Sequence, residues 1–457
     1  MATQKFSVPK GTRDFLPKES ARRNFIFSTL KDVFELFGYQ PIETPSMENL
    51  STLLGKYGDE GDKLVFRILN SGDFLNQASD EQKQTSHSLL PLITEKGLRY
   101  DLTVPFARFV VQHRDKLVFP FKRYQIQPVW RADRPQKGRY REFFQCDVDV
   151  IGSNSLLNEV ELLRIIAEVF KRLNIQVKIH LNNRKILAGI AEVLNLSDRL
   201  TDITVAIDKL DKMGIAKVNE ELLTKGIPAE AIERLQPLFT VNATHEETIR
   251  SISGIIASSE TGMKGVEEMK SVLEYLSELT SPEQIVFDLS LARGLNYYTG
   301  TIFEVRAADV QIGSICGGGR YDNLTGIFGL PDVSGVGISF GADRIYDVMN
   351  ELNVFPEQQE ASSKVLLVNF GGKEERFALK LLETFRNKAI ASELYPDNAK
   401  IGKQFAYADN KQIQFVIIAG SNEIENGSLS VKNMKTGEQY TAAVDECIDK
   451  IVSALAL

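Results

Sequence analysis

A strand pattern on both sides of one basic loop constrains the fold of this chain more than any other feature. Residues 144–150 (FQCDVDV) alternate strictly, so that apolar side chains lie on one face of a strand and the polar side chains of Gln145, Asp147 and Asp149 lie on the other. Residues 123–130 (RYQIQPVW), before the loop, are rich in residues that favour strands. The pattern predicts a β-hairpin, which is one pair of antiparallel strands.

The loop of this hairpin, residues 131–141 (RADRPQKGRYR), carries five positive side chains and a single carboxylate, Asp133, in a chain whose formal net charge is −7. A solvated charged turn is one interpretation. The alternative is that the arginines bind phosphate, because a guanidinium can form two parallel hydrogen bonds with phosphate oxygens. The polar strand face that follows could meet water, or its carboxylates could bind an amine beside the phosphate.

Composition limits the classes of protein that fit this chain. Its 457 residues are enough for two or three domains. No stretch reaches the about 18 to 20 apolar residues of a membrane span, and the N-terminal MATQKFSVPKGTRDF has no apolar core or cleavage site, so we expect a cytoplasmic protein without membrane contact. The cysteines and histidines lack the spacing of ligands, which predicts no metal site built from dedicated His or Cys residues.

The order of helix and strand patterns divides the chain into regions. Residues 21–37 and 158–173 have the helical spacing of apolar residues, and Gly38 follows the first helix as a C-cap. Strand patterns return after a long, mostly helical and polar region. We expect an antiparallel-sheet domain from residues 1–185 and 282–352, a mainly helical insertion at 186–281, a linker at 353–364, and a small α/β domain at 365–457.

The chain has neither a GxxxxGK[ST] P-loop nor a strand–GxGxxG–helix unit, so a nucleotide would have to bind to a sheet and to arginines. Residues 342–349 (ADRIYDVM) predict a helix after a strand, with Arg344 on its first turn. An arginine there opposes the helix dipole, which favours an anionic ligand or a partner carboxylate. The glycines at 317–319 allow the close approach of a ligand, a bulge or a tight turn.

Three segments together resemble the motifs of class II aminoacyl-tRNA synthetases. The helix at 21–37 with YQPIETP, ending at Pro45, resembles motif 1, VWRADRPQKGRYREFFQCDVDVIG resembles motif 2, and GVGISFGADRI resembles motif 3. Two further segments, LARGLNYYTGTIFEV and CGGGRYDNL, resemble signatures specific to the histidyl-tRNA synthetase family. The resemblance extends over essentially the whole chain, because residues 393–420 also resemble the family's anticodon-binding domain.

This resemblance implies a fold, an activity and partners. The chain is expected to have the antiparallel class II catalytic domain with a helical insertion, followed by an anticodon-binding α/β domain. It is expected to act as a homodimer that uses ATP, with Mg²⁺, to join L-histidine to a histidine-accepting tRNA through a histidyl-adenylate. No protein nucleophile is needed, because the histidine carboxylate itself attacks the α-phosphorus.

The resemblance also implies roles for individual residues. Catalysis is assigned to Arg131 and Arg293, which would flank the α-phosphate. ATP binding is assigned to Arg131, Asp133, Arg139 and Arg344. Histidine binding is assigned to Asp101, Thr103, Arg131, Gln145, Asp149, Arg293, Tyr297, Tyr298 and Tyr321. Contacts with the acceptor end of the tRNA are assigned to Arg134, Gln136, Lys137 and Arg141.

Some positions depart from the bacterial pattern of the family. Asp101 and Asp149 stand where many bacterial members have glutamate, so these segments look more like the eukaryotic and archaeal branch. Because a pocket that hydrogen-bonds both imidazole nitrogens can discriminate by about 10⁴ to 10⁵ without editing, we expect no editing domain.

Two alternatives remain open. One is the non-catalytic paralogue that serves as a histidine-sensing regulatory subunit of ATP phosphoribosyltransferase, and the other is a synthetase for another amino acid.

Overall fold

The structure is a computed structural model that describes residues 6–55, 62–136, 138–207, 209–236, 244–277, 285–292, 298–356 and 363–455. The chain divides into two compact units. One consists of Met1–Asp14 and Arg23–Phe355, and the other of Phe15–Arg22 and Pro356–Leu457.

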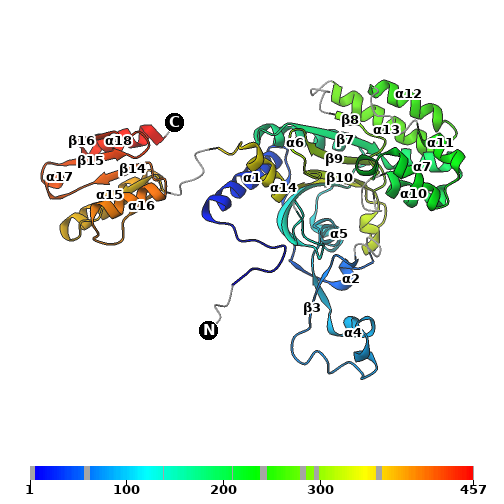
Figure 1. The fold of residues 1–457 in the computed structure, drawn as a ribbon, viewed down its shortest axis with the longest axis horizontal. Helices are drawn as coiled ribbons and strands as arrows, with labels where there is room; N and C mark the ends of the chain where they lie inside the picture. Colours follow the sequence, from blue (N-terminus) through cyan, green and yellow to red (C-terminus); the bar gives the residue numbers. More distant parts are fainter. Residues whose placement is uncertain are drawn as a thin grey trace. The chain divides into compact units, whose positions relative to one another are not determined.

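A large sheet forms the framework of the first unit (Figure 1), and every neighbouring pair of strands from β5 to β7 is antiparallel. The outer pairs, β1 with β5 and β7 with β8, are parallel. The predicted antiparallel sheet is confirmed. In spatial order its strands are β1 (Gln40–Pro41), β5 (Phe121–Trp130), β6 (Glu142–Ile151), β11 (Gly335–Gly341), β10 (Cys316–Tyr321), β9 (Thr301–Ala307), β7 (Val177–Asn183) and β8 (Ile285–Phe287).

The predicted hairpin is formed by β5 and β6, which pair along their full lengths. The apolar side chains of β6, among them Cys146 and Val148, are buried in the main hydrophobic core. The polar side chains of β6 lie on the opposite face, yet Asp147 and Asp149 are only 2% and 3% exposed. The interpretation that this polar face meets water is therefore wrong.

Three helices cover the face of the sheet that carries Cys146, and their apolar side chains join the main core: α1 (Pro17–Leu36), α6 (Leu157–Arg172) and α14 (Ala342–Leu352). The first two confirm the helices predicted at 21–37 and 158–173. Helix α1 begins earlier than predicted, at Pro17, because proline is preorganised for the first helical position. Gly38 follows α1 with a φ of +79°, as its C-cap role requires.

The region between β7 and β8 is helical in its described residues. Helices α7 and α13 pack closely, because a Cβ on Gly189 would lie 2.4 Å from the Cα of Gly262. The buried side chains of this region belong to the same hydrophobic core as those of the large sheet, so these helices pack together with the sheet (Figure 1). The helices are α7 (Arg184–Val193), α8 (Leu200–Ile207), α9 (Leu210–Met213), α10 (Ile215–Thr224), α11 (Ala229–Leu235), α12 (His245–Ile255) and α13 (Glu260–Ser277).

A small antiparallel sheet of β2 (Met47–Asn49), β4 (Lys96–Leu98) and β3 (Phe66–Ile68) leads into α5 (Thr103–Gln112), with α2 (Leu50–Leu53) after β2 and α4 (Ser86–Ile93) before β4. Arg99, directly after β4, is fully buried. Its guanidinium donates to the carbonyl oxygens of Thr44 at 2.6 Å and Pro128 at 3.0 Å. These bonds tie the start of α5 to the end of β5.

The C-terminal unit has helices on both faces of its own sheet. Helices α15 (Gly372–Asn387) and α18 (Val444–Leu455) pack on one face and α16 (Ile401–Asn410) on the other, while α17 (Ser421–Glu425) follows β14. The predicted α/β domain is confirmed. In spatial order its strands are β13 (Ser392–Leu394), β12 (Val365–Leu367), β14 (Phe415–Ile418), β15 (Ser428–Asn433) and β16 (Gln439–Ala443).

Candidate active site

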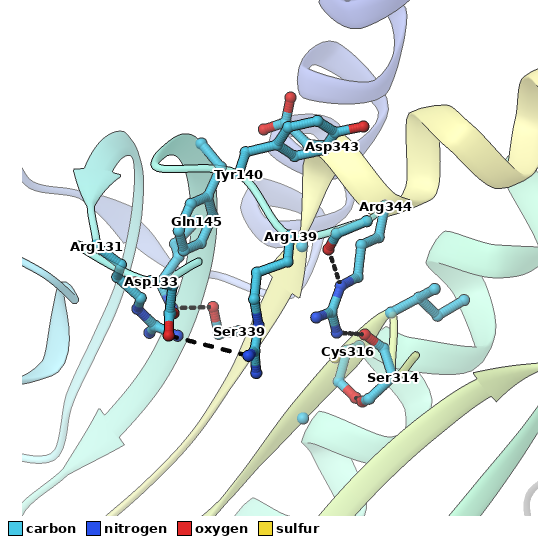
Figure 2. A pocket seen from close by; sticks show the side chains of 15 residues that line it. Arg131, Asp133, Arg139, Tyr140, Gln145, Ser314, Cys316, Ser339, Asp343 and Arg344 are labelled. Atoms are coloured by element: carbon cyan, nitrogen blue, oxygen red, sulfur yellow. Dashed lines mark hydrogen bonds and ion pairs between the residues drawn. The ribbon is translucent and has the colours of Figure 1, made fainter. Parts of the chain in front are cut away.

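A cavity of about 220 Å³ opens beneath the 131–141 loop. Its walls come from distant parts of the sequence, with the loop and the start of β6 on one side, and β10, β11 and the start of α14 on the other (Figure 2). The fold therefore brings together two segments that both carry arginines. The predicted site residues that line the cavity are Arg131, Asp133, Arg139, Gln145 and Arg344.

Arg344 is held at the cavity by backbone carbonyl groups. Its Nε donates to the carbonyl oxygen of Gly138 at 2.8 Å, and its Nη1 donates to that of Ser314 at 2.5 Å (Figure 2). The sequence favoured an anionic ligand or a partner carboxylate for this arginine. These two carbonyl oxygens orient the guanidinium at the cavity wall, where its positive charge favours an anion.

Arg131 and Arg139 approach the cavity from the loop side (Figure 2). The Nε of Arg131 donates to the carbonyl oxygen of Tyr100 at 2.9 Å, which holds this side chain near the start of α5. The side chain of Arg139 is 49% exposed, and its Nη1 lies 3.9 Å from Oδ1 of Asp133, a long distance for an ion pair. Arg139 is therefore the less constrained of the two arginines.

Backbone hydrogen bonds close the loop into a hairpin. At its base, the amide of Arg131 donates to the carbonyl oxygen of Arg141 at 2.9 Å. Near its tip, Gln136 and Arg139 form an isolated bridge, and Gly138 has a φ of +70°, a conformation that favours glycine.

The residues assigned to the tRNA acceptor end lie at different places on this loop. Arg134 and Gln136 are exposed near the tip. Arg141 lies at the base, where its Nε donates to the carbonyl oxygen of Asp133 at 3.1 Å. Lys137 lies outside the described residues.

A cluster of buried polar side chains continues from the cavity wall along β6. Gln145 lines the cavity, and Asp147 and Asp149 follow it on the same face. The Nη2 of Arg123, on β5, lies 2.8 Å from Oδ2 of Asp149 and 3.8 Å from Oδ2 of Asp147. From β10, the hydroxyl of Tyr321 donates to Oδ1 of Asp149 at 2.6 Å. The cluster is thus rich in carboxylates around one arginine.

Burial raises the pKa of both carboxyl groups in this cluster. For Asp149, burial is opposed by the charge of Arg123 and by the hydrogen bond from Tyr321. For Asp147, burial raises the pKa to about 7, opposed by the charge of Arg123 and supported by the neighbouring charge of Asp149. A cation bound beside these groups would stabilise their ionised forms.

Three acceptor oxygens on this face have no hydrogen-bond donor within the described part of the chain: Oε1 of Gln145, Oδ1 of Asp147 and Oδ2 of Asp149. The contact between Arg123 and Asp149 is an ion pair that lacks hydrogen-bond geometry. Because a buried acceptor without a donor is costly, this face is suited to receive the N–H groups of a ligand.

Other residues assigned to the histidine pocket surround the same cluster. Asp101 is buried just before α5, whose first residue is Thr103, and its charge contributes to the raised pKa of Asp147. Tyr298 packs against a hydrophobic cluster that includes Tyr321. Two predicted residues lie outside the described residues: Arg293 and Tyr297.

Two residues of the cluster, Arg123 and Asp147, were missing from the site assigned from sequence. A signal for Arg123 exists in the strand before the loop, where Arg123, Gln125 and Gln127 recur with a period of two. Pairing of β5 with β6 places Arg123 opposite Asp149. Asp147 lay on the predicted polar face, but nothing in the sequence distinguished a buried carboxylate from a solvated one.

Part of the segment GGGRYD supports the fold. Arg320 donates from Nε and Nη2 to the carboxylate of Glu159 at 2.5 Å and 2.6 Å, and this buried pair joins β10 to α6. The three glycines lie within β10, so the tight-turn interpretation is wrong. A Cβ on Gly318 would lie 2.0 Å from the carbonyl oxygen of Gly337, which shows that the close approach is to the neighbouring strand.

Within the described residues, no group of three or more His, Cys, Asp or Glu side chains is placed to hold a metal ion. No helix in the same part of the chain is long and apolar enough to cross a membrane.

The first unit has a largely antiparallel sheet and an arginine-bearing hairpin loop over a cavity, and Arg344 lies on the first turn of α14, directly after β11. Together these features define the catalytic unit of a class II aminoacyl-tRNA synthetase. Residues 11–345 match the family model of histidyl-tRNA synthetase, and residues 364–454 match that of an anticodon binding domain. The chain belongs to the histidyl-tRNA synthetase family.

Similar proteins agree with this assignment over nearly the whole chain. A histidine–tRNA ligase from Phocaeicola vulgatus is 59% identical over 443 residues, covering 96% of this chain and 98% of the relative. One from Porphyromonas gingivalis is 58% identical over 444 residues, covering 97% and 98%. The crystal structure of a histidyl-tRNA synthetase from a Nostoc species has a TM-score of 0.83 at 30% identity, covering 98% of this chain and 99% of that one.

Proposed function

We propose that this chain joins L-histidine to its tRNA, with the arginine-lined cavity as the ATP site and the buried carboxylate cluster as the histidine site. Membership of the family supports the reaction. In the first step, a carboxylate oxygen of histidine bonds to the α-phosphorus of ATP and pyrophosphate leaves. In the second step, a hydroxyl of the terminal adenosine of the tRNA attacks the histidyl carbonyl carbon and AMP leaves.

The observation that carries this proposal is the row of unpartnered acceptors on β6. One buried oxygen of each of Gln145, Asp147 and Asp149 lacks a hydrogen-bond donor among the described residues. Histidine offers an ammonium group and an imidazole N–H as donors. Since the row begins at the cavity wall with Gln145, a histidine bound there has its carboxylate close to the arginines of the cavity.

The cavity arginines support the binding of ATP. We assign the α-phosphate to Arg131, the γ-phosphate to Arg139, and the adenine ring and terminal phosphates to Arg344. Asp133 is assigned to the same ATP site. Mg²⁺ enters with ATP, as the counter-ion of its phosphates, and so belongs to the substrate. Fixed cations around the attacked phosphorus stabilise the charge that develops in the transition state without reorganising.

Arg293 is proposed as a second cation beside the α-phosphate, opposite Arg131. This role comes from its place in LARGLNYYTG. If it holds, Arg293→Ala abolishes adenylate formation while histidine affinity falls only modestly, because the arginine acts mainly on the phosphate. Near wild-type activation by this variant would show that the role is wrong.

The histidine pocket is proposed to extend beyond β6 to the residues around it. Asp101, Thr103 and Tyr298 surround the cluster, Tyr321 contacts it, and Tyr297 belongs to the same assignment. A pocket that pairs both polar ends of imidazole rejects amino acids that lack them, because their binding would leave buried polar groups unpaired. This supports the expectation that no editing domain is needed.

Binding of tRNA is proposed to involve the loop and the C-terminal unit. Arg134, Gln136, Lys137 and Arg141 are assigned to the acceptor end, and the exposed tip favours Arg134 and Gln136 over Arg141. In the C-terminal unit, Nζ of Lys411 lies 2.9 Å from Oε1 of Glu393, so part of its charge is already balanced.

We further propose a cytoplasmic homodimer. Helix α1 and β1 correspond to the motif that resembles the dimer-forming element of the class. A groove along them is lined by the apolar side chains of Phe27, Ile42 and Ile126. Sedimentation of the purified protein at micromolar concentration tests the dimer.

The test of the activity is ATP–pyrophosphate exchange with the purified chain and each proteinogenic amino acid in turn. Exchange with histidine alone is expected. Exchange with another amino acid would reassign the pocket. Absence of exchange from folded protein would favour the regulatory paralogue. The crystal structure of an ATP phosphoribosyltransferase regulatory subunit/histidyl-tRNA synthetase from Bacillus halodurans has this fold, with a TM-score of 0.74 at 22% identity.

A further inference from the structure

The N-terminal segment before α1 contacts the base of the 131–141 loop. The carbonyl oxygen of Gly11 accepts a hydrogen bond from the amide of Arg141 at 2.8 Å. A Cβ on Gly11 would lie 2.8 Å from Cγ of Pro135 and 2.9 Å from Cγ of Arg141, and the φ of Gly11 is +90°. Both the space and the backbone conformation at this position therefore suit glycine.

Arg13, two residues further on, joins the loop to helix α14. Its Nη2 donates to Oδ1 of Asp343 at 2.6 Å, and its Nη1 donates to the hydroxyl of Tyr140 at 3.1 Å. Its guanidinium carbon also lies 4.0 Å from the centre of the Tyr140 ring. Tyr140 in turn donates its hydroxyl to Oδ2 of Asp347 at 2.8 Å. One arginine thus contacts the end of the loop and the first turn of α14 at once.

Asp343, the carboxylate that Arg13 contacts, is adjacent to the cavity. Oδ2 of Asp343 accepts the amide of Phe144, at the start of β6, at 2.9 Å. The next residue, Arg344, reaches the cavity and donates to the carbonyl oxygen of Gly138 in the same loop. The loop is therefore attached to α14 at Gly138 and at Tyr140, and Arg13 supports the second attachment.

We propose that residues 11–13 form a clamp that holds the 131–141 loop in the ATP-binding conformation, and that Arg13 is a positioning residue for ATP rather than a contact to it. This inference rests on the assignment of the cavity to ATP. A loop with exposed arginines loses conformational entropy when it closes on phosphates. A clamp that orders the loop beforehand reduces that cost, which shows as tighter ATP binding.

The chemistry of the clamp requires the planar fork of arginine. Arg13 bonds to a carboxylate and a hydroxyl through different nitrogens while its plane lies over an aromatic ring. A lysine offers one ammonium and can keep the ion pair with Asp343, but it cannot maintain the stacked and forked contacts together.

The test measures KM for ATP and KM for histidine separately, by pyrophosphate exchange, in Arg13→Gln, Arg13→Lys, Tyr140→Phe and the Arg13→Gln/Tyr140→Phe double variant. We expect Arg13→Gln to raise KM for ATP by about 10- to 100-fold, the loss expected for charged hydrogen bonds, with KM for histidine unchanged. Arg13→Lys should recover part of the loss. The double variant should be less impaired than the product of the single effects, because both act on one contact.

The matched control is Arg172→Gln, which removes an exposed arginine paired with Glu168 on α6, and both KM values should stay at the wild-type level. An unchanged KM for ATP in Arg13→Gln would overturn the clamp. Equal rises in both KM values, or independent effects in the double variant, would also overturn it, since they indicate general support of the fold. If Arg13→Gln fails to fold, Tyr140→Phe and Arg13→Lys decide by the same criteria.

A variant of the cavity itself separates this inference from the proposed ATP site. Arg344→Ala is expected to raise KM for ATP. If it does not, the assignment of the cavity fails, and the clamp fails with it. If Arg344→Ala raises KM for ATP while the Arg13 variants leave it unchanged, the ATP site stands and the clamp alone is wrong.

Discussion

Replacing Tyr321 with phenylalanine removes a single hydroxyl from the buried carboxylate cluster. Tyr321 is 2% exposed, and its hydroxyl is 2.6 Å from Oδ1 of Asp149. The other oxygen of Asp149 forms an ion pair with Arg123 at 2.8 Å. The substitution leaves that ion pair and the ring of residue 321 in place, so it perturbs the proposed histidine site with little change in shape.

The expected magnitude follows from the charge on the acceptor. A hydrogen bond to a charged group contributes about 1.5 to 3 kcal/mol, and about 1.4 kcal/mol corresponds to tenfold in affinity. If Asp149 binds histidine as a carboxylate held by Tyr321, we expect KM for histidine to rise by about 10- to 100-fold. KM for ATP should remain at the wild-type level, because Tyr321 does not line the cavity assigned to ATP.

The pH dependence gives a second readout. The hydrogen bond from Tyr321 lowers the pKa of Asp149 against the effect of burial, so its loss moves that pKa further up. A smaller fraction of Asp149 is then ionised at neutral pH. The penalty on histidine binding should therefore decrease as the pH rises, because a higher pH restores the carboxylate.

The assay is pyrophosphate exchange with histidine and ATP varied in turn at several pH values. Tyr39→Phe is a matched control, since the buried Tyr39 donates to Oε1 of Glu161 at 2.9 Å, outside the cluster. A histidine KM that stays within about twofold of wild type, or a parallel rise in both KM values, would refute the reasoning for Tyr321.

Two further substitutions test the same cluster by other means. Asp147→Asn should stabilise the protein more at about pH 8 than at about pH 5, measured as the midpoint of thermal unfolding. The pKa of Asp147 is raised to about 7 by burial, so the native state holds a proton that the unfolded state releases, and stability falls as the pH rises toward that value. A shift that is independent of pH would contradict this. Gly337→Ala should lower kcat/KM for histidine by about 100-fold, the scale expected for a displaced binding group, because its Cβ would lie 1.8 Å from Oδ1 of Asp149. Gly254→Ala, where nothing lies within 4 Å of the added Cβ, is the control and should leave kcat/KM unchanged.

Local patterns were sufficient to predict some of the elements that carry the site. The alternation in residues 144–150 predicted β6 and its two faces, and the change from alternation to helical spacing predicted α14 with Arg344 on its first turn. These features are encoded locally, because side-chain period and turn chemistry depend on neighbouring residues. The resemblance of the motifs then indicated the family, which the comparisons confirm.

Burial and partner choice were not predictable in this way. Asp147 and Asp149 have the same spacing as carboxylates on a solvated strand, yet both are buried. Arg320 belongs to a segment with a family signature, but its charge is balanced by Glu159 on a distant helix. In each case the deciding neighbour comes from a part of the chain far away in sequence.

The sequence by itself determined the hairpin of β5 and β6, the helices α1, α6 and α14, the helical character of the insertion and the family. Only the tertiary structure decided that Arg123 faces Asp149 and that Arg13 connects the loop to α14. It also decided that β6 presents, beside an arginine-lined cavity, buried acceptors that have no hydrogen-bond donor within the described residues. The physical reason is that periodicity specifies which face of an element a side chain occupies, whereas desolvation, ion pairing and pKa depend on what is packed against that face.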